Sequence, residues 1–349
     1  MTQDNTRALI WFGDIGIHDR PLAGGKGASL GEMTRAGLPI PEGFVVSTQA
    51  FTQWLDTLDA RHAIRRRISA LQHDALDAVN ACTADIRATI EQEALTNALL
   101  DELATSYERL GSGPVAVRSS ATSEDSEEAS FAGLQDTYLW VKGVDALVEK
   151  VRTCWASLYS PESVSYRLRL RLPEDQLAMG VVVQRMVHSK CSGVMFTRSP
   201  TTGDRSVITI EGSWGLGSAI VSGEVTPDRF VVNKVTGEIR NRSIADKAVE
   251  HVPDVAGGVR ELEVETLRRK ACCLSDAQIQ ALAQIGRTVE KHYGAPQDIE
   301  WALDQDDSIR LLQSRPETVW ATRDRAPVAK PAASAFDHIF ATLGGQKKS

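Results

Sequence analysis

The chain has 349 residues, a length that favours two lobes with extensions over a single compact core. Apolar residues make up 42% of it and charged residues 24%, as is ordinary for a protein with a buried core in water. The formal net charge of −7 argues against nonspecific binding to nucleic acid or to anionic membranes, because both favour basic surfaces. An anionic ligand would therefore need positive groups placed locally.

The cysteines and the apolar runs of the sequence indicate which classes of protein can be excluded. The five cysteines are odd in number and include no CxxC pair, so we expect reduced thiols rather than a disulfide framework or a zinc site. The N-terminal segment has no apolar signal core, and no apolar run approaches the ~20 residues needed to span a bilayer. We therefore expect a cytoplasmic protein that makes no membrane contact.

The N-terminal part predicts a strand, a glycine-rich loop and then helices. Residues 8–15 suit a short strand, and residues 21–29 (PLAGGKGAS) suit a loop. Helical spacing begins at Ala28, and a second strand is predicted at 44–47. Residues 49–110 contain many Ala, Leu, Arg and Glu residues and no proline, which predicts several helices.

The remainder alternates strands with polar loops. Strands are predicted at 114–120, 136–141 and 180–187, with helices over 143–170 between them. Further strands with glycine-rich turns are expected over 191–235, followed by a polar stretch at 236–262. The C-terminal elements are a helix at 275–293, a hairpin at 298–315 with the turn DQDD, a linker-like segment at 323–335 and a short helix at FDHIFATL.

Three of the segments contain groups suited to phosphates or nucleosides. Glycines around Lys26 allow close backbone approach to a polyanion, although an ordinary turn with a surface lysine explains this segment better when it is taken alone. Arg118 ends a strand and precedes hydroxyl-rich residues that could fold over phosphates, or form a flexible acidic surface loop. Glu211 and the glycines after it could line a nucleotide, or form a tight turn with Trp214 in the core.

The hairpin is the most informative of these patterns. Side chains two residues apart on a strand share a face, so Asp298 and Glu300 can lie beside Gln313 and Arg315. Carboxylates bind Mg²⁺, which bridges phosphates, and arginine neutralises charge on a transferring phosphoryl group. Charged residues on a strand are usually only solvated, but four convergent groups between core residues favour a site. The residues expected to face the core are Ile299, Trp301 and Leu312.

Taken in order, these segments resemble the N-terminal nucleotide-binding domain of phosphoenolpyruvate synthase, pyruvate phosphate dikinase and rifampicin phosphotransferase. The matching stretches are GGKGASLGEMTRAGLPIPEGFVVS, VAVRSSATSEDSEEASFAGLQDTYL, VVVQRMV, SGVMFTRSPTTGD, EGSWGLGSAIVSGEVTPDRFVV, QDIEWAL and LLQSRP. The resemblance implies an α+β fold of the ATP-grasp type, in which two lobes with mixed or antiparallel sheets and flanking helices clamp ATP. We place the N-terminal lobe with its helical insertion at 1–190, the C-terminal lobe at 191–320, and a linker with a short helix at 321–349.

The resemblance also implies roles for individual residues. Lys26 and Arg118 would contact phosphates, and Arg315 would stabilise the transferring group, which makes these three the expected catalytic residues. The strand from Gln184 to Val187 would lie against adenine and Glu211 near the ribose. The full set expected to hold ATP is Lys26, Arg118, Ser130, Ala132, Gly133, Gln184, Met186, Val187, Glu211, Gln313 and Arg315. The set expected to hold Mg²⁺ is Glu300, Gln313 and Asp298.

The sequence departs from the family pattern in two ways. Local differences affect the phosphate-loop contacts: Gly27 stands where Asn is common, Leu134 where Gln is frequent, and Arg198–Ser199 where the pair often ends in Asp or Asn. The larger departure is that none of the seven histidines has the Thr/Ser/Cys-His-Ala context of the family's phosphorylated histidine. His188 follows a predicted cleft strand, but a packed or surface histidine is the simpler interpretation.

We therefore expect the ATP-binding subunit of a dikinase-type phosphotransferase, with ATP and Mg²⁺ as ligands and no nucleic acid partner. ATP would pyrophosphorylate a histidine on a partner subunit, which would release phosphate, pass its phosphoryl group to a small acceptor and leave AMP. In layout the chain is similar to the ATP-binding subunit of phenylphosphate synthase, whose acceptor is phenol, and the tail GGQKKS favours a complete subunit. The alternatives are a fragment of phosphoenolpyruvate synthase acting on pyruvate and a non-catalytic nucleotide-binding regulatory module.

Overall fold

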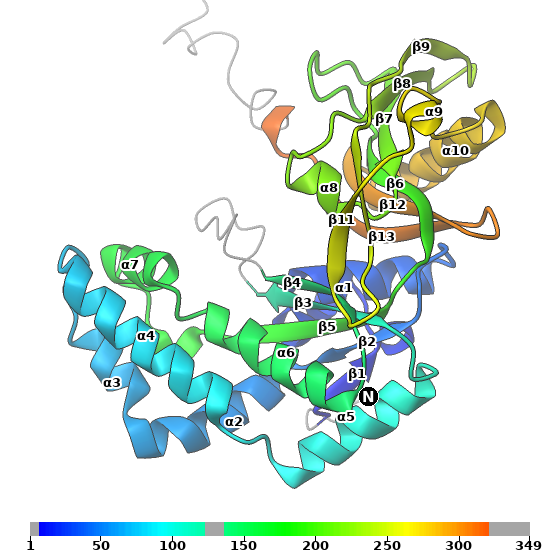
Figure 1. Cartoon of the computed structure of the whole chain (residues 1–349). Coiled ribbons are helices and arrows are strands. Elements are labelled where there is room, and N and C mark those ends of the chain that lie inside the picture. The colour runs from blue at the N-terminus through cyan, green and yellow to red at the C-terminus, as the bar shows by residue number, and fades with distance from the viewer. Residues whose placement is uncertain (1–6, 123–135, 321–349) are drawn as a thin grey trace, which may run out of the picture.

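The computed structural model describes residues 7–122 and 136–320, which form two lobes with one main sheet each (Figure 1). All neighbouring strands in both sheets are antiparallel, as the α+β prediction allows. In spatial order, the N-terminal sheet consists of β1 (Leu9–Trp11), β2 (Gly43–Val46), β5 (Met179–Arg185), β3 (Val115–Ala121) and β4 (Thr137–Val141). The C-terminal sheet consists of β13 (Ile309–Pro316), β12 (Gln297–Asp304), β6 (Ser189–Phe196), β7 (Val207–Trp214), β8 (Asp228–Asn233) and β9 (Ile239–Ser243).

Helices cover both faces of the N-terminal sheet. One face packs against a helical layer, where Ser47 and Thr96 cap helices by accepting hydrogen bonds from backbone N–H groups three residues on. This layer consists of α2 (Thr48–His62), α3 (Ile64–Ser69), α4 (Leu76–Gln92), α5 (Asn97–Arg109), α6 (Val144–Ser157) and α7 (Pro161–Leu170). The other face packs against α1 (Arg20–Arg35). Short 3-10 turns span Phe12–Asp14, Ile17–Asp19 and Glu174–Gln176.

The glycine-rich segment is helical, so the prediction of a loop at 21–29 is wrong. It belongs to α1, which is kinked at Gly24 with φ of 70°. A Cβ at Gly24 would lie 1.9 Å from the carbonyl oxygen of Ser120 on β3. The glycine therefore lets α1 approach the protein's own strand, where Ser120 Oγ donates to Ala23 O at 2.9 Å and accepts from Gly27 N at 3.1 Å.

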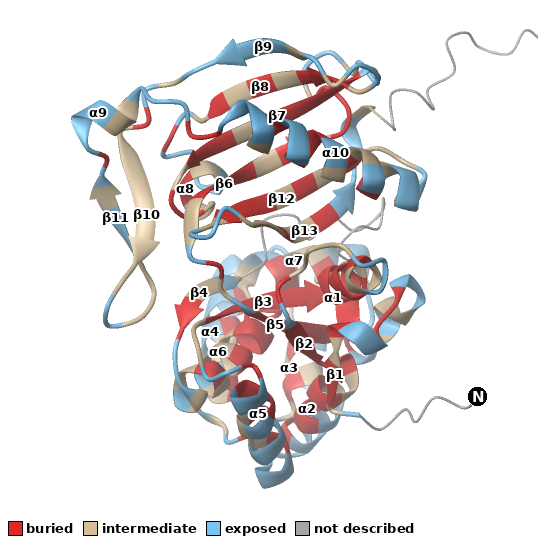
Figure 2. Ribbon diagram, turned by 90° about the vertical axis from the view of Figure 1, so that its right-hand side faces the viewer, coloured by how far each residue is buried: buried red, intermediate tan, exposed pale blue. Residues whose placement is uncertain are grey.

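The C-terminal sheet is covered on one face by α10 (Asp276–Tyr293), which matches the helix predicted at 275–293 (Figure 2). Ser275 and Gln278 form a capping box at its start, and Gly294 ends it in the left-handed conformation. The polar stretch at 236–262 contains β9 and a separate two-stranded ribbon. That ribbon pairs β10 (Val249–Pro253) with β11 (Val259–Glu263). Two short helices, α8 (Ser218–Val221) and α9 (Thr266–Arg269), complete the lobe.

Of the two hydrophobic cores formed by the described residues, one is shared by both lobes. Alternation along β5 sends Val181 and Val183 into the core beneath the helical layer and Val182 into the other. The second core runs from Leu30 of α1 to Trp301 of β12, so it is continuous between the lobes. Figure 2 shows buried residues along the central strands of both sheets. This shared core therefore holds the two lobes together at the base of the space between them.

The expectations about membrane spans, disulfides and the phosphate-covering residues can be compared with the described part of the chain. No helix within residues 7–122 and 136–320 is long and apolar enough to cross a membrane. All five cysteines fall within these ranges and none forms a disulfide, as expected. The predicted phosphate-covering residues Ser130, Ala132 and Gly133, and the linker and helix expected over 321–349, lie outside the described residues.

Candidate nucleotide site

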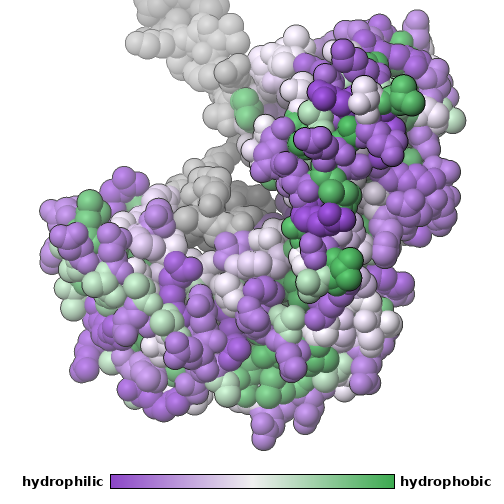
Figure 3. Space-filling view, in the orientation of Figure 1, coloured by the Kyte–Doolittle hydropathy of each residue, from purple (hydrophilic) through white to green (hydrophobic). Residues whose placement is uncertain are grey.

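A cleft with a volume of about 380 Å³ lies between the lobes, within the size range of small-molecule sites. Its walls come from β3, β4 and β5 on one side and from β6, β12, β13 and α8 on the other. The space-filling view shows the molecule hollowed between the two lobes (Figure 3). Of the residues predicted to hold ATP or Mg²⁺, those that line the cleft are Lys26, Arg118, Gln184, Met186, Val187, Glu300 and Gln313.

Arg118 joins the two lobes across the cleft. It ends up buried on β3, with 8% of its surface exposed. Its Nη1 donates to Leu312 O at 3.1 Å, and its Nη2 donates to Glu300 Oε2 at 3.1 Å and to Gln313 Oε1 at 2.5 Å. Its Nε is buried and has no hydrogen-bond partner within residues 7–122 and 136–320. A buried guanidinium with one unpaired donor is costly in isolation, which is typical of a site that receives an anion.

Glu300 and Gln313 form what we call the inner pair of the hairpin. They are direct cross-strand partners on β12 and β13, as the alternation predicted. Because both side-chain oxygens lie within hydrogen-bond distance of the same Arg118 nitrogen, they converge on one point. A carboxylate and an amide oxygen are hard ligands, and this donor set fits Mg²⁺.

The register of the hairpin shifts immediately after the inner pair. The shift between Glu300 and Trp301 places Leu311 opposite Trp301. Leu311 is therefore the residue buried in the core, and the prediction that Leu312 faces the core is wrong. Leu312 instead lines the cleft and accepts the hydrogen bond from Arg118 through its carbonyl oxygen.

Asp298 and Arg315 form the outer pair of the same hairpin. They are also cross-strand partners, with Arg315 Nε 3.4 Å from Asp298 Oδ2. Neither residue lines the cleft, and 63% of the Arg315 side chain is exposed. Burial raises the pKa of Asp298 to about 6, an effect that Arg315 opposes and nearby Glu317 reinforces. Asp298 Oδ1 is buried and finds no hydrogen-bond partner in the described part of the chain. The outer pair is therefore close to the cleft without being part of its wall.

Lys26 and Gln184 are buried in the N-terminal wall. Lys26 lies shortly after the kink in α1, and its Nζ donates to Ser119 O at 3.0 Å. Gln184 sits on β5 opposite Ala116 of β3, and its Nε2 donates to Pro41 O at 3.4 Å. The end of β5 is held by backbone hydrogen bonds, including one from Met186 N to Pro114 O at 3.0 Å. Both polar side chains are thus held by backbone carbonyl groups of the N-terminal lobe.

The structure does not bring Glu211 into the cleft. This residue lies in β7 opposite Arg229 of β8, and Arg229 Nε is 3.7 Å from its Oε1. The turn that follows reaches the cleft instead, through the segment 216–222 that includes α8. Gly215, with φ of 71°, makes this turn possible, and its presence after a buried strand was a signal for it. Arg185, within the strand predicted to lie against adenine, also lines the cleft, and the other lining residues that the sequence did not single out are Ala116, Thr137, Leu139, Ser189, Gly193 and Val194.

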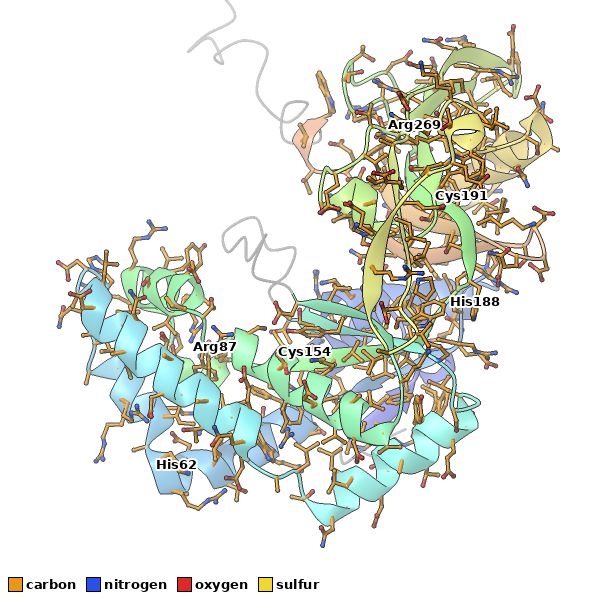
Figure 4. All side chains as sticks on the ribbon, viewed as in Figure 1. His62, Arg87, Cys154, His188, Cys191 and Arg269 are labelled. Atoms are coloured by element: carbon orange, nitrogen blue, oxygen red, sulfur yellow. The ribbon has the colours of Figure 1, made fainter. Side chains whose placement is uncertain are left out.

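Among the described residues that line the cleft there is no histidine. His188 is exposed at the junction of the lobes, where Figure 4 labels it. Its ring packs edge-on against Trp140, with 4.7 Å between the ring centroids. His188 is thus one residue beyond the cleft strand, and it contacts an aromatic side chain rather than lining the cleft.

Comparison with known proteins places the chain in a family. Residues 20–335 match the model of the pyruvate phosphate dikinase AMP/ATP-binding domain. The phosphoenolpyruvate synthase of Aeropyrum pernix is 40% identical over 363 residues, covering 93% of this chain and 44% of that protein. The one from Pyrococcus furiosus is 37% identical, covering 89% and 44%. A probable phosphoenolpyruvate synthase of Methanocaldococcus jannaschii is 40% identical, covering 90% and 27%. The chain thus spans less than half the length of these relatives.

Solved structures are much more distant. PH1788 from Pyrococcus horikoshii is 13% identical, with a TM-score of 0.31 over 62% of this chain and 81% of that one. The ATP-grasp ligase PsnB is 9% identical, with a TM-score of 0.26 over 91% of this chain and 60% of that one. Similarities of this size add nothing to the assignment, which rests on the family match. The chain belongs to the family of the pyruvate phosphate dikinase AMP/ATP-binding domain and is an α+β protein of the ATP-grasp type.

Proposed function

We propose that this chain binds ATP with Mg²⁺ between its lobes and is the nucleotide-binding part of a dikinase-type phosphotransferase. The observation that carries the proposal is Arg118, which is buried in one lobe, bonded to Glu300 and Gln313 of the other, and left with an unpaired Nε. A phosphate group would satisfy this donor and reward the burial of the charge.

The remaining roles follow from position. Glu300 and Gln313 would hold Mg²⁺, which supplies neutralisation of phosphate charge when bound. Lys26 and Arg118 would contact phosphates, and Gln184 to Val187 would line the adenine side opposite apolar residues of the C-terminal wall. The loop with Ser130, Ala132 and Gly133 would cover the phosphates. Arg315 would reach the transferring group from outside the wall, with Asp298 positioning it.

The phosphoryl group would pass to a histidine that lies outside these two lobes. This part of the proposal is supported by the absence of histidine from the described cleft lining and by the greater length of the curated relatives. The histidine would receive the β,γ-pyrophosphoryl group, with AMP, phosphate and a phosphorylated small molecule as products. A separate partner subunit, as in phenylphosphate synthase, makes phenol the candidate acceptor.

A second candidate is the ATP-binding part of a phosphoenolpyruvate synthase that acts on pyruvate. It is favoured by the phosphoenolpyruvate synthases that are about 40% identical to nearly the whole chain. A non-catalytic nucleotide-binding module is the least supported function, because Lys26, Arg118 and Glu300 line one cleft and Arg315 lies beside it.

The test uses ATP labelled separately at the β and γ positions, with Mg²⁺ and the histidine-bearing protein that co-purifies with this chain. The proposal requires AMP, γ-label released as phosphate and β-label retained on the partner histidine. Formation of ADP with only γ-label transferred would overturn it. Adding phenol or pyruvate then identifies the acceptor, because only the correct one removes β-label from the histidine.

A further inference from the structure

A cluster of three potential metal ligands lies outside the candidate nucleotide site. It consists of Glu224, His251 and Glu261, each of which places one ligand atom within 4.8 Å of the others. Glu224 follows α8, His251 lies on β10, and Glu261 lies on β11. One imidazole and two carboxylates are a ligand set found for divalent transition metals, and three protein ligands leave a position for water.

The backbone builds this cluster in two steps. First, His251 and Glu261 are direct cross-strand partners in the ribbon, so their side chains lie side by side. Second, the ribbon is fastened to the turn after β7, where Leu216 N donates to His251 O at 2.9 Å. Gly215 makes this approach possible, since a Cβ there would lie 2.4 Å from His251 O. The position of the histidine is therefore set by the fold.

The imidazole is oriented by its second nitrogen. Ser218 Oγ lies 2.7 Å from His251 Nδ1, and His251 Nε2 lies 2.7 Å from Glu224 Oε2. Metal-binding histidines are almost always held in this way, with one ring nitrogen bonded to a neighbour and the other free for the ion. When Nδ1 donates to Ser218, the lone pair of Nε2 points towards the carboxylates.

A simple ion pair between His251 and Glu224 does not explain the whole arrangement. It leaves Glu261 as a second carboxylate at the same point, with a single imidazole between the two acids. A divalent cation would balance both carboxylates at once. The cluster is also accessible, because His251 and Glu261 line a second cavity of about 580 Å³ between the ribbon and β4.

We propose that Glu224, His251 and Glu261 form a site for a divalent transition metal of the Zn²⁺ class. The ion would connect the ribbon to the segment that follows α8. Both α8 and the start of this segment line the candidate nucleotide cleft. At its other end the ribbon reaches the N-terminal lobe, where Gly258 N donates to Trp140 O at 3.1 Å (Figures 1 and 2). Metal binding would therefore stiffen a connection that runs alongside the cleft and bridges the lobes. This inference does not depend on the proposed function.

The test measures Zn²⁺ binding to the chelator-treated chain by calorimetry, and Co²⁺ binding by absorption spectroscopy. Excess Mg²⁺ is present to fill the Glu300–Gln313 site, and ATP is omitted. We expect one Zn²⁺ per chain, with affinity lowered about 100-fold or more by His251→Gln or Glu261→Gln and about 10-fold by Ser218→Ala. The matched control is Glu263→Gln, which removes an exposed carboxylate from the same face of β11 and should bind as the wild type does.

Thermal unfolding is measured in two conditions, with chelator and no metal, and with Zn²⁺ and no chelator. Zn²⁺ should raise the unfolding temperature of the wild type and of Glu263→Gln but not of His251→Gln, while all three unfold alike without metal. The proposal is overturned if the wild type binds no more Zn²⁺ than His251→Gln, or if Glu263→Gln loses binding as fully as Glu261→Gln. ATP binding is scored separately, so failure of the metal site and failure of the nucleotide site are distinguishable.

Discussion

The inner and outer pairs of the β12–β13 hairpin have similar chemistry and different surroundings. Each pair sets a carboxylate opposite a nitrogen-bearing side chain, two residues apart along the same strands. The inner pair lines the cleft and is bonded to buried Arg118, whereas the outer pair stays outside the wall with Arg315 largely exposed. Groups held in place before a ligand arrives are suited to binding it. Arg315 is exposed and, among the described residues, held only by its 3.4 Å contact with Asp298, so it is suited to engage a group that enters after the nucleotide has bound.

The difference also separates the energetic roles of the two arginines. Removing one partner of a buried, hydrogen-bonded charge is strongly destabilising, whereas an exposed ion pair contributes ~0–1 kcal/mol. We therefore expect Arg118 to affect both folding and ligand binding, and Arg315 to affect phosphoryl transfer with little effect on folding. Substitutions of these residues test the difference between the two pairs.

Arg118→Ala should have the largest effect. It removes the fork that joins β3 to the inner pair, so we expect kcat/KM for ATP-dependent transfer to fall on the order of 1000-fold, with a large loss of ATP affinity. The measurements are ATP titration calorimetry and the rate of β-label transfer to the partner histidine. Near-normal ATP binding would show that the inner pair can be organised without this arginine.

The matched control for Arg118→Ala is Arg152→Ala. Arg152 of α6 is half-buried and donates to a backbone oxygen (Glu93 O, 2.9 Å), and its Nε has no hydrogen-bond partner among the described residues, but it lies away from the cleft. The control should lose stability without losing ATP affinity at temperatures where it is folded. Equal loss of affinity in both variants would assign the effect of Arg118 to folding alone.

Arg315→Ala should have the second largest effect, and this effect should fall on the rate of transfer rather than on ATP affinity. We expect transfer to slow on the order of 100-fold while the ATP dissociation constant changes less than about threefold, since the side chain lies outside the cleft wall. Stability should change by no more than ~0.5 kcal/mol, as at other exposed sites. Arg310→Ala, on the same strand, is the control and should leave both quantities unchanged. If affinity and rate fell together, Arg315 would belong to the binding group.

The local pattern of the sequence was enough to predict the inner and outer pairs. Alternation along two strands with a polar turn between them specifies which side chains share a face, and the observed register agrees. The position of the core residue Leu311 could not be predicted, because a bulge after Glu300 depends on packing that the alternation does not show. The position of Glu211 opposite Arg229 could not be predicted either, because the sequence indicates its strand but not which strand lies beside it in the sheet.

The sequence did not predict the kink of α1 or the ribbon, and the reasons differ. The segment around Gly24 has the composition of a loop, and only its contact with Ser120 on a distant strand makes it helical on both sides of the kink. The ribbon strands carry mostly polar, partly exposed residues, so no apolar alternation marks them. The kink thus depends on a contact between distant segments, whereas the ribbon is a local hairpin without a recognisable pattern. The proposed metal cluster that the ribbon carries was therefore not visible in the sequence either.

Asp298→Asn should have the smallest effect on activity and a diagnostic effect on stability. Burial raises the pKa of Asp298 to about 6 in the folded chain, against ~3.9 when unfolded. Between these values the folded state binds more protons than the unfolded state, so the free energy of unfolding falls as the pH rises from about 4 to 6. The Asn variant has no proton to lose. It should match the wild type near pH 4 and exceed its stability by at most ~3 kcal/mol near pH 7.

Urea unfolding of the ligand-free chain below, within and above this pH range measures the difference. The inner pair provides the contrast: Glu300→Gln should destabilise the chain at neutral pH, because it removes the carboxylate that balances buried Arg118. If Asp298→Asn also destabilised at neutral pH, the contact with Arg315 would outweigh the burial of the charge. The outer pair would then be a structural ion pair, as Arg118 and Glu300 are, and Arg315 would not be free to engage a transferring group.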